Sequence, residues 1–392
     1  IQDLKQKEAD AQAKKDTAKQ AAKSAFDTAK GACTTKGSGF KTCMDNARKE
    51  AANKRLGDDV NYDGLSAAGK AKIDAEFERE QREADDAAVA QALKDTKDGT
   101  DAEKKAAGLA AFKNSDRAKD ADGNDLAGEA LEFAYEQAKR DGAKGSVKAA
   151  QEACIAAVKS KSKTKEQCKN EADEAYFESL GIDPTKAGLA DKADAAEIRK
   201  AAAADDVLSS TSTCKEAADG DASLLAECDK EARVKAAEAL GEATDYTTMS
   251  SKEKAAFDAK FERITKEARA KELAEAMRAN KDIADKTVRK AAALEIFKKS
   301  NTKTYSGADA EKDAEMDFEK AKREGAKAEL ANTMKDCKVA GKADCEDVAE
   351  QAFADSMGLD KANDLDFKSK FEVFKKDAAA SAAVKKTSAY KE

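Results

Sequence analysis

The sequence predicts an all-α fold, an elongated tandem repeat of disulfide-stapled helical hairpins in two similar units. Three observations lead to this prediction. Eight cysteines fall into four local pairs, a single Pro interrupts 392 residues rich in Ala, Glu, Lys and Asp, and several segments recur roughly 184 residues further along the chain. Because proline breaks helices and alanine favours them, the composition indicates long helices.

Composition also limits the core that these helices can share. Charged residues make up 39% of the chain and aromatic residues 5%, and the 41% counted as hydrophobic is mostly Ala. Alanine buries little apolar area, so elongated hairpins fit better than a sphere. The 72 basic and 79 acidic residues are interleaved, as on solvated helix faces with i,i+4 ion pairs.

Each cysteine pair is followed by a Leu-Gly or Met-Gly step, about 12 residues after its second cysteine. The spacers between paired cysteines are short and mostly polar, and the glycine indicates a helix C-cap. The motif is therefore an αα-hairpin with a disulfide across its tip. The predicted pairs, each with its step, are Cys33–Cys43 with Leu56-Gly57, Cys154–Cys168 with Leu180-Gly181, Cys214–Cys228 with Leu240-Gly241, and Cys337–Cys345 with Met357-Gly358.

Two alternatives remain open for these cysteines. They could stay reduced as small buried side chains, or bind zinc, which would need cysteines from two hairpins because the chain has no His and no C-x-x-C. Disulfides across short loops favour an oxidising compartment, so we expect an extracellular or secretory location. The chain opens at Ile1 without Met, which we interpret as a processed or trimmed product.

Helix boundaries follow from capping signals. Residues 1–32 predict one polar helix that leads into the first hairpin. Ser66 is the expected N-cap of a second long helix, and Thr100 with Glu103 forms a capping box for the next one. Ser250 with Glu253 forms a similar box in the second half of the chain.

Two further signals lie in the first predicted unit and at its end. A polar loop at 116–125 precedes a long helix that reaches Cys154. Asp183-Pro184 predicts a helix start, with Asp as N-cap and Pro at the first helical position.

An internal duplication accounts for the recurring segments. Residues 73–79 recur at 257–263, residues 112–115 at 297–300, and residues 135–144 at 318–327. The predicted division is a first unit at 1–184, a second at 185–358, and a terminal helix at 359–392 that starts a further unit or docks. The matched apolar positions predict a packing stripe: Ile73/Phe257, Phe77/Phe261, Ala84/Ala268, Val89/Leu273, Leu93/Met277, Leu109/Leu294 and Phe112/Phe297.

The terminal helix concentrates aromatic residues in a chain that has few. Phe367, Phe371 and Phe374 are spaced by four and three residues and share one helical face. One alternative is that this face packs back onto the chain's own second unit. The other is an assembly surface that docks head-to-tail on a neighbouring unit or molecule, near the helix that bears Phe26.

One loop resembles the first half of an EF-hand calcium site, with Asp59, Asn61, Asp63 and Gly64 at the expected spacing. Lys70 stands where the bidentate Glu should be, and the second unit does not preserve the ligands. An Asx-rich turn is the alternative. We predict no cofactor and no other metal site.

Catalytic and nucleic-acid motifs are missing from the sequence. Without His there is no Ser-His or Cys-His pair, and neither a P-loop nor a dinucleotide-binding glycine motif occurs. No basic patch with interleaved aromatic residues is present, so nucleic acid is not an expected partner. No apolar run is long enough for membrane insertion. We therefore expect a protein that is not an enzyme.

Disulfide-stapled, Ala/Lys/Glu-rich helices of this kind resemble the matrix proteins of ciliate extrusomes and the helical surface proteins of trypanosomes. No motif specific to either family occurs, so the resemblance assigns no residue a role. The sequence predicts a structural protein, a secreted building block of an extracellular or vesicular fibre, lattice or sheath, whose partner is itself. The alternative is a secreted or cell-surface helical binding module, of a receptor or antigen type.

Overall fold

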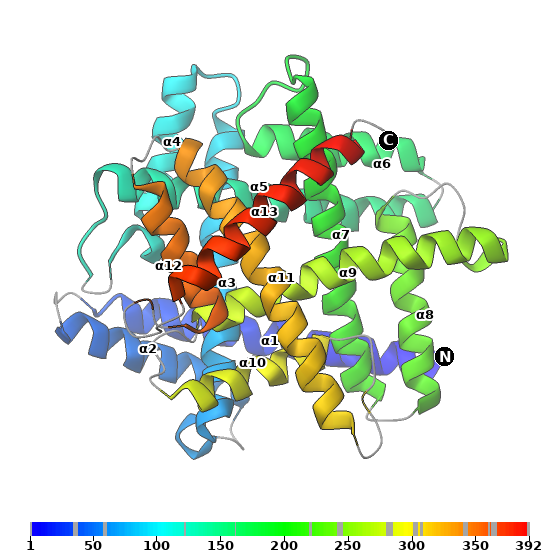
Figure 1. Cartoon of the computed structure of the whole chain (residues 1–392), viewed down its shortest axis with the longest axis horizontal. Helices are drawn as coiled ribbons and strands as arrows, with labels where there is room; N and C mark the ends of the chain where they lie inside the picture. The colour runs from blue at the N-terminus through cyan, green and yellow to red at the C-terminus, as the bar shows by residue number, and fades with distance from the viewer. Residues whose placement is uncertain are drawn as a thin grey trace. The chain divides into compact units, whose positions relative to one another are not determined.

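The described residues of this computed structural model form an all-helical protein (Figure 1). The structure describes residues 2–33, 38–57, 61–120, 123–160, 162–218, 222–240, 246–279, 285–300, 305, 309–339, 344–359, 361 and 367–389. No strand occurs among them, and their one isolated β-bridge joins Lys119 and Asp125. The predicted all-α class is confirmed.

Most of the described residues lie in long α-helices, and three short 3-10 helices occur among them. The first half contains α1 Gln2–Lys30, α2 Ser38–Leu56, η1 Tyr62–Gly64, α3 Ala67–Asp95, α4 Asp101–Lys113, η2 Asp116–Ala118, α5 Gly128–Lys159 and α6 Lys165–Ser179. The second half contains α7 Leu189–Ala218, α8 Ala222–Ala239, η3 Tyr246–Thr248, α9 Ser251–Ala279, α10 Lys286–Ser300, α11 Ala310–Val339, α12 Cys345–Met357 and α13 Phe367–Ala389.

Side-chain caps start the helices where the sequence predicts them. The Thr100 hydroxyl accepts the backbone N–H of Glu103, whose carboxylate accepts the N–H of Thr100 in return. Ser250 and Glu253 make the same reciprocal bonds at the start of α9. Each reciprocal pair satisfies backbone donors that the first helical turn leaves without a partner.

The predicted helix start at Pro184 is wrong. The Asp183 carboxylate accepts the backbone N–H of Thr185, which makes an Asx turn and not a helix cap. The helix α7 begins five positions beyond Pro184, at Leu189, where the N–H of Gly188 donates to the Asp191 carboxylate.

Glycines in the left-handed conformation follow three of the stapled hairpins. Gly57, Gly181 and Gly358 have φ angles of 82°, 69° and 63°. A side chain is strained in this conformation, which explains why glycine ends α2, α6 and α12. The fourth predicted step, at Gly241, lies outside the described residues.

The chain divides into two compact units. One consists of Ile1–Gln81, Lys119–Phe133 and Arg269–Glu392, and the other of Arg82–Ala118 and Ala134–Ala268. Each unit draws on both predicted sequence repeats. The repeat boundaries at 1–184, 185–358 and 359–392 therefore concern the sequence and stay a prediction.

The buried apolar residues of the described chain form several small clusters. In the first unit, Phe26 of α1 packs edge-on against Phe77 of α3, with ring centroids 4.8 Å apart. In the second unit, Tyr176 and Phe177 of α6 pack with alanines of α5 and α7. This pattern agrees with a composition that is rich in Ala and poor in aromatic residues.

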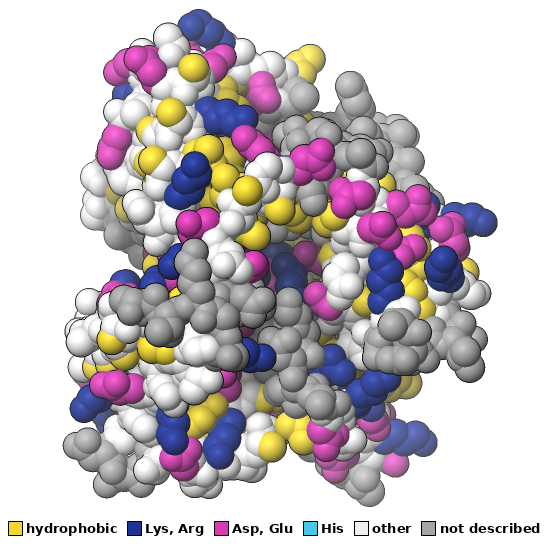
Figure 2. All heavy atoms as spheres, turned by 90° about the vertical axis from the view of Figure 1, so that its left-hand side faces the viewer, with side chains coloured by type: hydrophobic (Ala, Val, Ile, Leu, Met, Phe, Trp, Pro, Cys, Tyr) yellow, Lys and Arg dark blue, Asp and Glu magenta, His cyan; other side chains and the backbone are white. Residues whose placement is uncertain are grey.

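The surface carries both signs of charge. Figure 2 shows Lys and Arg side chains interspersed with Asp and Glu over the face drawn. Many of these side chains pair within one helix, as Lys23 does with Asp27 at 2.6 Å. None of the described helices has an apolar stretch that could cross a membrane.

Candidate functional site

All eight cysteines form disulfides, in the four pairs that the spacing predicts: Cys33–Cys43, Cys154–Cys168, Cys214–Cys228 and Cys337–Cys345. The paired Cα atoms lie 5.5 to 5.7 Å apart, within the usual range for a disulfide. Three of the bonds join residues inside two successive helices, α5 with α6, α7 with α8, and α11 with α12, and the fourth joins Cys33, three residues beyond α1, to Cys43 of α2.

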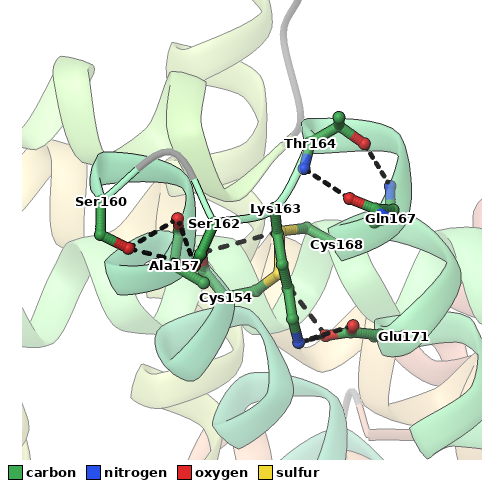
Figure 3. Close-up of polar contacts among 9 residues, drawn as sticks. All are labelled: Cys154, Ala157, Ser160, Ser162, Lys163, Thr164, Gln167, Cys168 and Glu171. Atoms are coloured by element: carbon green, nitrogen blue, oxygen red, sulfur yellow. Dashed lines mark hydrogen bonds and ion pairs between the residues drawn. A yellow bond between two sulfur atoms is a disulfide. The ribbon is translucent and has the colours of Figure 1, made fainter.

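The second staple shows how local sequence builds a hairpin tip (Figure 3). Cys154 lies inside α5 and Cys168 inside α6, so the bond ties two helical turns together and not the loop itself. The hydroxyls of Ser160 and Ser162 each donate to the carbonyl oxygen of Ala157 at 3.0 Å. These bonds satisfy the last turn of α5.

A capping box closes the other side of the same tip. The Thr164 hydroxyl accepts from the N–H of Gln167 at 3.2 Å, and the Gln167 amide oxygen accepts from the N–H of Thr164 at 2.7 Å. Lys163 and Glu171 form an ion pair at 2.6 Å beside the disulfide (Figure 3). The tip is thus held by one covalent bond and several local polar contacts.

A small cavity borders this disulfide. It is lined by Gln151 and Cys154 of α5, Cys168 of α6, Arg199 of α7 and the end of α8, and its volume is about 40 Å³. That volume accommodates a few waters. A drug-sized ligand needs roughly 300 Å³ or more.

The four disulfides differ in how far solvent reaches their sulfur atoms. Cys33 and Cys43 are both partly exposed, whereas Cys214 and Cys228 are 2% and 1% exposed. Thiol–disulfide exchange needs access to a sulfur. We expect a mild thiol reductant to open Cys33–Cys43 first and Cys214–Cys228 last in the folded protein, as measured by timed alkylation and peptide mass mapping. Equal rates in the folded protein would contradict this order, and in denaturant the difference should disappear.

The predicted aromatic face of the terminal helix is buried on the chain's own helices. Phe367 and Phe371 of α13 are 2% and 1% exposed, and Phe374 is partly buried. Their ring centroids lie 6.0, 5.7 and 4.9 Å from that of Phe353 on α12. Of the two alternatives for these residues, this structure has the first, packing onto the same chain, and the face is not an open surface.

We call the groove that receives these rings the α13 seat. It is formed by buried apolar residues of α11 and α12, and α13 lies across both helices (Figure 1). Two ion pairs flank it, Lys375–Glu346 at 2.5 Å and Lys327–Asp377 at 3.6 Å. The buried residues that line the seat are Ala326, Leu330, Ala349, Phe353 and Ala354.

In the candidate calcium loop, two of the predicted ligands already have partners. The Asn61 side chain accepts the N–H of Asp63 and caps η1, and the Asp63 carboxylate pairs with Lys49 at 2.6 Å. Asp59 lies outside the described residues. These contacts are those of an Asx turn.

A buried ion pair is the feature that the sequence did not reveal. Asp86 of α3 is 3% exposed and pairs with Arg117 of η2. Burial raises the pKa of the Asp86 carboxyl, and the Arg117 guanidinium opposes that rise. The interleaved charges of the sequence predict solvated helix faces along the whole chain. The spacing of Asp86 does not distinguish it from the other charged residues of α3.

Fold and staples together define a class: an all-helical protein with four disulfide-linked helical hairpins. No protein family model, curated protein or solved structure matches this chain significantly.

Proposed function

We propose that this chain is a structural protein, a secreted helical-repeat building block that assembles with copies of itself into an extracellular or vesicular fibre, lattice or sheath. The observation that carries the proposal is a set of contacts that recur between positions roughly 184 residues apart in the sequence. Tandem copies of one helical unit suit a molecule that extends a lattice by repetition.

Two apolar clusters support the duplication position by position. The cluster on α5, α6 and α7 and the cluster on α11, α12 and α13 use corresponding residues, once the shorter spacer between Cys337 and Cys345 is allowed for. The corresponding residues are Ala143/Ala326, Val147/Leu330, Ala172/Ala349, Tyr176/Phe353, Phe177/Ala354, Leu180/Met357 and Ile182/Leu359. The helix α13 follows α12 and packs with α11 and α12, as α7 follows α6 and packs with α5 and α6.

A close helix contact recurs in the same way. Gly142 of α5 lies against the backbone oxygen of Asp86 on α3, and Gly325 of α11 lies against that of Ala270 on α9. Both pairs match at the shift of roughly 184 residues that relates the repeats. Low-complexity sequence would not place the same backbone contact in both copies.

A tyrosine–carboxylate bond repeats as well. The Tyr62 hydroxyl donates to Asp74 at 2.6 Å, and the Tyr246 hydroxyl donates to Asp258 at 3.0 Å. Each bond ties a 3-10 turn to the long helix that follows it. The two halves thus share polar contacts as well as apolar ones.

The four disulfides suit a structural role in an extracellular or vesicular environment. Each closes a short loop, for which the chain-entropy model gives about 2–3 kcal/mol of stabilisation. Small apolar clusters stabilise long helices only weakly, so covalent links at four tips offset what the cores lack. The proposed role needs no catalytic residue and no cofactor.

The dependence of the particle mass on protein concentration tests this proposal. We expect light scattering of the oxidised protein to show a mass that rises well above that of one chain as concentration increases. A single-chain mass up to millimolar concentration, under oxidising conditions and at physiological salt, would overturn the structural role. It would leave the binding-module alternative.

A further inference from the structure

We propose that α13 is exchangeable between molecules, so that in the assembled protein α13 of one copy occupies the α13 seat of a second copy. This inference rests on the proposed self-assembly and names its contact. The occupant is an identical chain, since the seat already fits α13 in apolar shape and in charge.

The first argument is that α13 packs on α11 and α12 through one apolar cluster, to which its buried phenylalanines belong. Between Phe367 and Ala378 its buried side chains form one stripe, and on the opposite face of that segment Val373 is 56% exposed. This is the helix-in-groove arrangement, in which an amphipathic helix binds by one apolar face.

Charge complements the apolar stripe on both sides. Lys375 of α13 pairs with Glu346 of α12, and Asp377 of α13 pairs with Lys327 of α11. The two pairs have opposite polarity, so they fix the direction in which α13 lies in the seat. A helix from a second copy would reproduce both pairs.

A disulfide distinguishes α7 from α13 and explains why α13 can leave its seat whereas α7 cannot leave its own. The helix α7 occupies the corresponding place on α5 and α6, but the Cys214–Cys228 disulfide also ties it to α8. No cysteine lies in α13, so its packing in the seat is noncovalent. Exchange breaks no covalent bond and restores every contact in the partner, which is the energetic basis of domain swapping.

The concentration of the chain determines whether α13 occupies its own seat or the seat of another copy. A tethered helix meets its own seat at an effective concentration in the millimolar range. Dilute chains therefore keep α13 in place, and packed chains exchange it. A chain that gives its helix to one neighbour and receives one from another extends an open filament.

Cross-linking in a mixture of isotope-labelled and unlabelled chains tests the exchange of α13 without any substitution. Equal amounts of ¹⁵N-labelled and unlabelled full-length chain are incubated together, and a zero-length carbodiimide reagent then joins Lys375 to Glu346. We expect almost no mixed-isotope cross-linked peptides at micromolar concentration, rising to about a quarter of the cross-links when the chain concentration equals the millimolar effective concentration.

The two proposals can fail separately. If light scattering shows assembly while every Lys375–Glu346 cross-link stays within one isotope, α13 exchange is wrong and the structural role stands. If neither assembly nor mixed cross-links occur at millimolar concentration, both are wrong.

Complementary variants give a second test. Phe371→Asp makes an α13 that cannot seat, and Phe353→Asp makes a seat that cannot receive it. We expect each variant alone to keep the mass of one chain, and their mixture to form a 1:1 complex. Circular dichroism checks that both variants retain the parent helicity, and Val373→Asp on the open face should behave as the parent. A mixture of two helical variants that forms no complex would overturn the proposal.

Discussion

Gly142→Ala is expected to destabilise the compact unit that contains it by about 3 kcal/mol. A β-carbon at this position would overlap the backbone oxygen of Asp86 and come within 3.1 Å of the Ala90 methyl group. Backbone atoms cannot rotate away as a flexible side chain can, so α3 and α5 must separate. Gly325→Ala should act similarly, because its β-carbon would overlap the backbone oxygen of Ala270.

The same helix supplies the matched control. Gly145 is exposed on α5, and a β-carbon there meets nothing within 4 Å. Alanine is the better helix former by about 1 kcal/mol, so Gly145→Ala should stabilise slightly. Urea unfolding followed by circular dichroism gives both values. A loss at Gly142 no larger than the change at Gly145 would show that the two helices do not cross in contact.

The disulfides, capping boxes and C-cap glycines were predictable because the residues that form them lie close together in the sequence. Disulfide partners lie within one hairpin, and capping boxes join residues three apart, so short-range spacing was enough to identify both. The left-handed glycines after the hairpins have the same origin. Pro184 is the exception, since Asp183 bonds its own turn and the cap that α7 uses comes later.

Long-range packing explains what the sequence left open. The spacing of Phe367 and Phe371 predicts a shared face, but the same spacing serves a seat on the chain itself or on a neighbour. Only the position of Phe353, on another helix, distinguishes the two. The contact between Asp86 and Arg117 likewise joins separate elements, so helix periodicity gave no sign of it.

Burial determines how much the ion pair between Asp86 and Arg117 contributes to the stability of the fold. Two charges removed from water lose hydration, and their attraction compensates only while both are present. Burial lowers the pKa of Arg117 and raises that of Asp86, while each partner opposes the other's shift. Asp141, Arg82 and Asp85 also act on Asp86, with the carboxylates raising its pKa and the guanidinium lowering it.

Arg117→Met is therefore expected to cost about 3–5 kcal/mol of stability near neutral pH, because it leaves the Asp86 carboxylate buried without its main counter-charge. The folded state then holds the Asp86 proton more tightly than the unfolded state does. For a carboxyl whose folded pKa is raised, stability falls as pH increases from the unfolded pKa towards the folded one. The loss should accordingly be smaller at pH 5 than at pH 8.

Replacing both partners separates this effect from simple loss of packing. Asp86→Leu combined with Arg117→Met removes the charges together, and we expect the double variant to be more stable than Arg117→Met alone by about 1 kcal/mol or more. Lys186→Met breaks an exposed pair with Asp183 in the same unit and should leave stability nearly unchanged, because water already screens the two charges. Urea titrations at pH 5 and pH 8 measure all of these values. A pH-independent loss for Arg117→Met, unchanged in the double variant, would show that Asp86 carries no buried charge.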